Sequence, residues 1–134
     1  MIKQVSVYAE NKKGCFRDIT GLLTDSGINI LGSVTNDSAE YGIVRLVVSD
    51  PDKAKEVLSG AGYLCRLTRV LGIELDDEVG ALNRLLSELV DSNINVDYLY
   101  LSYNRASGKP IMVLHTADTD QVENILVSRG YHAI

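Results

Sequence analysis

The chain has 134 residues, of which 46% are hydrophobic and 23% are charged, and its formal net charge at pH 7 is -5. This composition is typical of a folded globular protein and excludes an intrinsically disordered chain. Lys and Arg are scattered rather than gathered into a basic stripe, and no apolar run approaches the roughly 18 residues of a membrane-spanning helix, so we expect neither a nucleic-acid nor a membrane partner.

Apolar periodicity along the first half of the chain predicts six elements. Residues 5–10 alternate between apolar and polar as in a strand with one buried face, whereas the apolar residues between Phe16 and Leu23 have the spacing of an amphipathic helix. Asp50-Pro51 joins a capping residue to a favoured first helical residue and predicts a second helix start. In chain order we expect a strand over 5–10, a helix over 15–26, strands over 28–35 and 43–48, a helix over 51–61 and a strand over 63–68. This is the order of the ferredoxin-like βαββαβ unit with an antiparallel sheet.

The second half of the chain repeats the first. Glu10-Asn11-Lys12-Lys13-Gly14 and Gly27-Ile28-Asn29-Ile30 reappear as Asp76-Asp77-Glu78-Val79-Gly80 and Asn93-Ile94-Asn95-Val96, displaced by the same 66 positions. Apolar core positions repeat in the same register, which indicates duplication. We therefore predict an α+β protein with two such units, residues 1–68 and residues 69–134.

Each copy places a polar side chain beside a glycine turn at a helix start, and an Asn where the next strand begins. The glycine allows a tight turn, and the first helical amides, expected to be free, would offer N–H groups to a carboxylate. The Asn or Asp oxygens would accept hydrogen bonds from an ammonium group, so the sequence predicts a site for a free amino acid. The expected ligand-binding residues are Asn11, Gly14, Cys15, Phe16, Asn29 and Ile30 in the first copy, and Asp77, Gly80, Ala81, Leu82, Asn95 and Val96 in the second.

Each Asn taken alone is also a common turn residue that bonds its own loop, so it is the joint repetition that favours a ligand. The copies also differ, because Asp77 stands where the first copy has Asn11. Its negative charge favours an ammonium group and disfavours a ligand with an acidic side chain.

The Asn-containing turn that ends in Gly14, followed by the helix and by Gly27-Ile28-Asn29-Ile30, resembles the ACT domain, a regulatory amino-acid-binding module. The resemblance covers both copies, although Lys13 and Val79 stand where the family usually has Pro. It implies that the two sheets join side by side into one eight-stranded sheet with helices on one face, and that effector binds where the two units meet. It also implies a regulatory sensor that modulates an enzyme of amino-acid metabolism. The alternative is a protein-interaction subunit of a larger enzyme that binds no ligand.

A second copy of the chain is an expected partner. Large residues occupy both faces of the strand between Ile94 and Tyr103, and one helix layer covers only one face of a sheet. We therefore expect the other face to pack against a second chain in a homodimer. The alternative is that these tyrosines are half-exposed residues with high β-propensity.

Catalytic apparatus is not expected. The sequence contains no phosphate-binding loop motif, no H-E-x-x-H, no C-x-x-C and no G-x-S-x-G, so we predict no catalytic residue, no metal and no cofactor. Cys15 at a helix start could be a nucleophile, but a small packed residue is favoured because Ala81 occupies the matching position. The absence of a signal-peptide pattern and the two unrepeated cysteines predict a cytoplasmic protein with reduced thiols.

Overall fold

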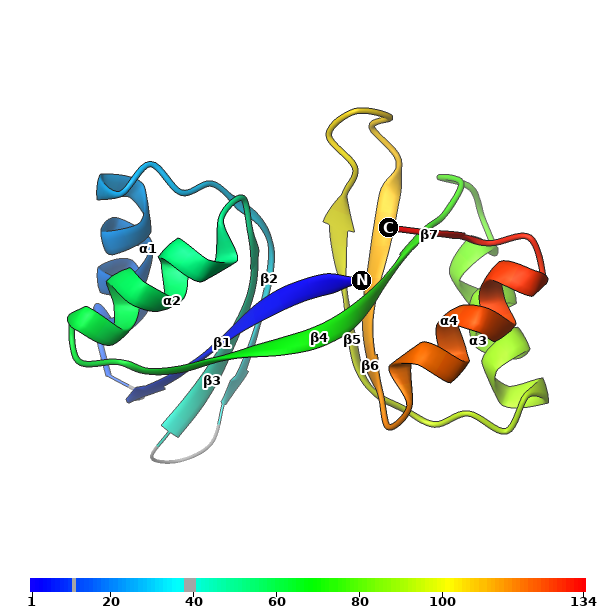
Figure 1. Cartoon of the computed structure of the whole chain (residues 1–134), viewed down its shortest axis with the longest axis horizontal. Helices are drawn as coiled ribbons and strands as arrows, with labels where there is room; N and C mark the ends of the chain where they lie inside the picture. The colour runs from blue at the N-terminus through cyan, green and yellow to red at the C-terminus, as the bar shows by residue number, and fades with distance from the viewer. Residues whose placement is uncertain (11, 38–40) are drawn as a thin grey trace. The chain divides into compact units, whose positions relative to one another are not determined.

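The computed structural model of the chain describes residues 1–10, 12–37 and 41–134, and among them it contains four α-helices and seven β-strands (Figure 1). The predicted α+β class is therefore confirmed. The chain divides into two compact units. The first unit is Lys3–Thr68, and the second is Arg69–Ile134 together with Met1–Ile2.

The first unit is a sheet whose strand order is β4-β1-β3-β2, with two helices packed on one face. Its elements are β1 (Ile2–Glu10), α1 (Cys15–Asp25), β2 (Ile30–Asp37), β3 (Tyr41–Val48), α2 (Pro51–Gly60) and the first part of β4 (Leu64–Glu74). Both β1 and β2 run antiparallel to β3, with Val5 and Ser33 opposite Leu46. Val5 from β1, Leu23 from α1 and Leu58 from α2 are fully buried in one core, which holds the helices against the sheet.

The second unit repeats this arrangement with the strand order β5-β6-β4-β7. Its elements are the rest of β4, α3 (Ala81–Asp91), β5 (Val96–Tyr103), β6 (Pro110–Thr116), α4 (Thr119–Ser128) and β7 (His132–Ala133). Leu114 of β6 lies opposite Leu71 of β4 on one side and Leu99 of β5 on the other, in antiparallel register. The core formed by Leu71 and Leu114 includes Leu89 of α3 and Leu126 of α4.

The prediction of eight strands was wrong because β4 is a single strand. The sequence analysis placed one strand at the end of the first copy and another at the start of the second, but the chain runs through both as Leu64–Glu74 (Figure 1). No Gly or Pro occurs between Leu64 and Leu71, so nothing in the sequence forces a turn at Arg69.

Burial along β5 changes the argument for a homodimer. Tyr100 is only 6% exposed, and Val113, its antiparallel partner on β6, is 0% exposed, so this face is covered within a single chain. On the opposite face, Leu101 and Tyr103 remain 45% and 56% exposed. These two side chains share the face of Leu99, which packs in the core with α3 and α4, so they do not belong to the face predicted to pack against a second chain, and the homodimer stays a prediction.

Two further properties follow from the described residues. Cys15 and Cys65 are free thiols, with Cys15 buried and Cys65 partly buried. None of the described helices combines the length and the apolar character that crossing a membrane would need.

Candidate functional site

Both predicted glycine turns have the same backbone geometry. Gly14 caps α1 with φ 85° and ψ -5°, and Gly80 caps α3 with φ 89° and ψ -5°. This left-handed conformation is accessible to glycine and strained for residues with a Cβ. The two turns are therefore repeats of one local structure, and each brings the end of a strand to the first turn of a helix.

The amides at these helix starts are only partly available, which corrects the sequence-based expectation. The amide of Cys15 donates to the carbonyl of Lys12 at 3.2 Å, and that of Ala81 donates to the carbonyl of Glu78 at 3.3 Å. In the second unit, the described residues provide no acceptor for the amides of Leu82 and Asn83, the next two positions of α3. The open donors thus lie one residue further along the helix than expected.

A hollow of about 220 Å³ lies beside the Gly80 turn, and we call it the loop hollow. Its wall combines an acidic part from the chain between β4 and α3 with an apolar part from β5 and β6. Its charged and large apolar lining residues include Asp76, Asp77, Glu78, Leu101, Tyr103 and Met112. Ala81 and Leu82 of the predicted site also line it. All of these residues belong to the second unit.

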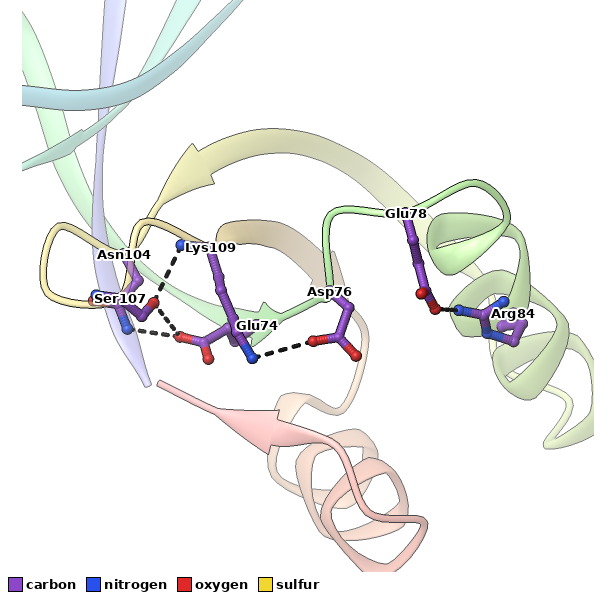
Figure 2. A network of polar contacts seen from close by, with 7 residues as sticks. All are labelled: Glu74, Asp76, Glu78, Arg84, Asn104, Ser107 and Lys109. Carbon is purple, nitrogen blue, oxygen red and sulfur yellow. Dashed lines mark hydrogen bonds and ion pairs between the residues drawn. The ribbon is translucent and has the colours of Figure 1, made fainter.

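Two of the three carboxylates in the loop hollow are occupied by cations, as Figure 2 shows. Asp76 Oδ1 lies 3.1 Å from Lys109 Nζ, and this hydrogen bond, together with the charge of Asp76, raises the pKa of the lysine above its ordinary value. Glu78 forms an ion pair with Arg84 of α3. Asp77 has no hydrogen bond or ion pair with any residue in the described part of the chain. Its carboxylate is consequently the one that can accept a ligand group.

The hairpin between β5 and β6 is fixed to β4 by the same polar network (Figure 2). Glu74 accepts a hydrogen bond from Asn104 Nδ2 at 2.7 Å and another from Ser107 Oγ at 3.1 Å. These bonds hold the residues before Pro110 against the end of β4, next to Lys109. These bonds tie the β5–β6 hairpin, whose strands supply the apolar part of the loop hollow, to the end of β4, which leads into the acidic part.

The remaining predicted residues lie elsewhere. Asn11 is outside the described residues. The backbone amide of Asn29 donates to the Ser49 hydroxyl at 2.9 Å, and the backbone amide of Ser49 donates to the Asn29 carbonyl at 2.9 Å. These two bonds secure the start of β2. Asn95 is exposed just before β5, while Ile30 and Val96 pack against the cores of their own units. None of these last four residues lines the loop hollow.

Sequence reasoning missed a pair of hollows on the other side of the two glycine turns. We call them the helix-side hollows: the first, of about 420 Å³, contains Cys15 and Tyr63, and the second, of about 290 Å³, contains Ala81 and Tyr131. They occupy equivalent positions in the two units. The Gly-Tyr pair that follows the second helix of each copy is the repeated signal that could have found them.

Comparison with known proteins identifies a matching family. A family model described as ACT domain pair matches residues 1–134. The crystal structure of protein BT0572 from Bacteroides thetaiotaomicron is 28% identical and superposes with a TM-score of 0.90, covering 99% of this chain and 91% of that one. No curated protein matches the chain.

More distant solved structures share the fold. The regulatory subunit of aspartate kinase from Thermus thermophilus, in its ligand-free form, is 11% identical with a TM-score of 0.68 over 94% of this chain and 91% of that one. A structure of aspartokinase alpha and beta subunits is 17% identical with a TM-score of 0.59, over 92% and 89% of the two chains. At this level of identity the similarity concerns the fold.

Proposed function

Because the chain belongs to the family of ACT domain pairs, whose model spans residues 1–134, we propose that it is a regulatory sensor that binds a free amino acid. In this role it modulates a partner enzyme of amino-acid metabolism and is not itself a catalyst. The observation that carries the proposal is the loop hollow, where an unpaired carboxylate adjoins a helix turn with open amides.

The chemistry of the loop hollow suits both ends of an amino acid. The α-ammonium group would bind Asp77, the carboxylate in the described wall without a cation partner. The α-carboxylate would accept hydrogen bonds from the amides of Leu82 and Asn83, aided by the positive end of the α3 dipole. A ligand of this size reaches micromolar affinity with about -8 kcal/mol, well inside the limit of about -1.5 kcal/mol per heavy atom.

The wall of the hollow also favours one class of side chain. Leu101, Tyr103 and Met112 offer apolar surface, whereas Asp76 and Glu78 add negative charge nearby. An acidic ligand side chain would be repelled by these carboxylates. We therefore expect amino acids with apolar side chains to bind more tightly than aspartate or glutamate. The corresponding site in the first unit, including Asn11 and Asn29, stays a prediction.

Thermal unfolding with each of the twenty amino acids tests the proposal. A ligand at a hundredfold excess over its dissociation constant should stabilise the chain by about 2.7 kcal/mol. Asp77→Ala should weaken binding of that ligand by about 1.5 to 3 kcal/mol, because it removes a hydrogen bond between charged groups. Asp91→Ala is the matched control, since it removes an exposed carboxylate from the far end of α3, the helix that follows Asp77. Stabilisation by no amino acid, or equal losses in both variants, would contradict the proposal.

A second candidate function is supported by exposed apolar side chains around the same loop. Val79, which follows Glu78 in the chain, is 100% exposed, and Leu101 and Tyr103, which line the loop hollow, are 45% and 56% exposed. Such a patch suits a protein-interaction subunit that binds no ligand. If no amino acid stabilises the chain and Tyr103→Ser abolishes its association with a partner enzyme, this function is the correct one.

A further inference from the structure

The two helix-side hollows are built on the same backbone. In the first unit the amide of Lys12 donates to Glu10 at 2.9 Å, and the equivalent amide of Glu78 donates to Asp76 at 2.9 Å. Gly62 and Gly130, which turn the chain out of α2 and α4, have φ values of 96° and 90°. The amides of the tyrosines that follow these glycines donate to Leu58 and Leu126 at 3.0 and 3.1 Å. Any difference in what the hollows bind therefore comes from their side chains.

The charged side chains of the two hollows have diverged. Asp18, on the first turn of α1, has Arg84 at the equivalent position of α3. The first hollow is lined by two carboxylates, Glu10 and Asp18, and by a single ammonium group, that of Lys12. Lys12 Nζ lies 3.3 Å from Glu10, so it is already paired. Among the described residues, Asp18 has no ion-pair partner.

Aromatic side chains complete the first hollow. Tyr8 from β1 and Tyr63 from the turn after α2 are both half-buried and line the hollow, whose inner part includes the buried Cys15. Burial raises the pKa of the Tyr63 phenol, and the Cys15 thiol and the Asp18 carboxylate raise it further, so Asp18 acts electrostatically on this part of the hollow. In the second unit the position of Tyr8 is taken by Glu74, which removes one aromatic wall.

We propose that the first helix-side hollow is a binding site for a small organic cation, namely a primary amine with an apolar body. The ammonium group binds the free carboxylate of Asp18, and the apolar body lies against Tyr8 and Tyr63, whose ring faces attract cations and apolar groups. The second hollow should not bind the same ligand, because Arg84 stands where the first hollow has Asp18, and the carboxylate of Asp76 is already paired with Lys109. This site is independent of the loop hollow and of the amino acid proposed to bind there.

NMR titration of the full-length, ¹⁵N-labelled chain with 2-phenylethylamine tests the site. The amides of Gly62 and Tyr63 should shift in a saturable manner, while those of Gly130 and Tyr131 in the second hollow should not. The neutral analogue 2-phenylethanol, which has the same ring but no positive charge, should cause no saturable shift at the same concentrations. Saturable shifts at both hollows, at neither, or equally with the alcohol would overturn the proposal.

Two variants assign the effect to the charge. Asp18→Asn keeps the shape of the side chain and should weaken amine binding about tenfold, the loss expected for a hydrogen bond between charged groups. Arg84→Gln alters the equivalent position in the second unit and should leave binding at the first hollow unchanged. Thermal unfolding of both variants verifies that they fold, and an unchanged affinity in folded Asp18→Asn would refute the assignment.

Discussion

The two units share their backbone and differ in the charge of their hollows. Gly14 and Gly80 adopt the same left-handed geometry at the helix starts, and Gly62 and Gly130 also share a positive φ where they line the two helix-side hollows. In the first turn of the helix that follows, the two units differ instead: α1 has the carboxylate of Asp18 where α3 has the guanidinium of Arg84. After duplication, positions that set backbone conformation were retained, because few residues adopt positive φ, whereas exposed lining positions were free to acquire different binding properties.

The largest expected effects concern the cores, and they test how closely the units correspond. Leu23 of α1 and Leu89 of α3 are equivalent residues, with exposures of 0% and 1%. Leu23→Ala and Leu89→Ala should each destabilise the chain by about 2 to 5 kcal/mol through lost burial and a residual cavity. Urea denaturation followed by circular dichroism measures both costs. A cost below 1 kcal/mol in only one variant would show that the two cores are not equivalent.

An intermediate effect is expected at the glycine turns. Gly14→Ala and Gly80→Ala should each cost about 1 to 2 kcal/mol, because alanine is strained at positive φ even though no backbone atom crowds the added Cβ. Gly21 lies inside α1 with open space around it, so Gly21→Ala should instead stabilise the chain by about 0.5 to 1 kcal/mol. Thermal unfolding of the three variants should therefore give two decreases and one increase. An increase at Gly14 would mean that its turn differs from that at Gly80.

The smallest effect is a pH dependence that arises from Tyr63 in the first unit. The pKa of Tyr63 is raised above 10.0 in the folded chain, mainly by burial, so the neutral phenol is favoured by folding. The corresponding stability is present below pH 10 and is lost as the pH rises through the folded pKa of Tyr63. Unfolding measured between pH 9 and pH 11 should show this loss in the natural chain and a weaker one in Tyr63→Phe. Identical profiles would contradict the raised pKa.

Much of the fold was predictable because it depends on local patterns. Asp50-Pro51 marks the start of α2, apolar and polar residues alternate along β1, and the core positions repeat between the two copies. Each of these signals can be recognised in the sequence itself. The merging of two predicted strands into β4 was not predictable from the same patterns. The two strands join because no turn interrupts the chain at Arg69, and the alternation of apolar residues is the same in one long strand as in two short ones.

The candidate site was less accessible to sequence reasoning. The glycine turns and Asp77 were identified because they repeat or stand out locally, but the walls of the hollows come from residues far away in the sequence, such as Tyr103 and Tyr63. The hydrogen bonds between the backbone of Asn29 and Ser49, made across the β2–β3 hairpin, were likewise not predicted. Such pairings depend on tertiary structure, which the sequence does not display directly.

The continuity of β4 also bears on how this gene can evolve. The boundary between the two ancestral copies, near Thr68 and Arg69, now lies in the middle of a hydrogen-bonded strand. Splitting the gene at that point would sever β4 and leave each product with half of it. Either copy produced alone would therefore lack part of a strand that the intact chain shares between the two units.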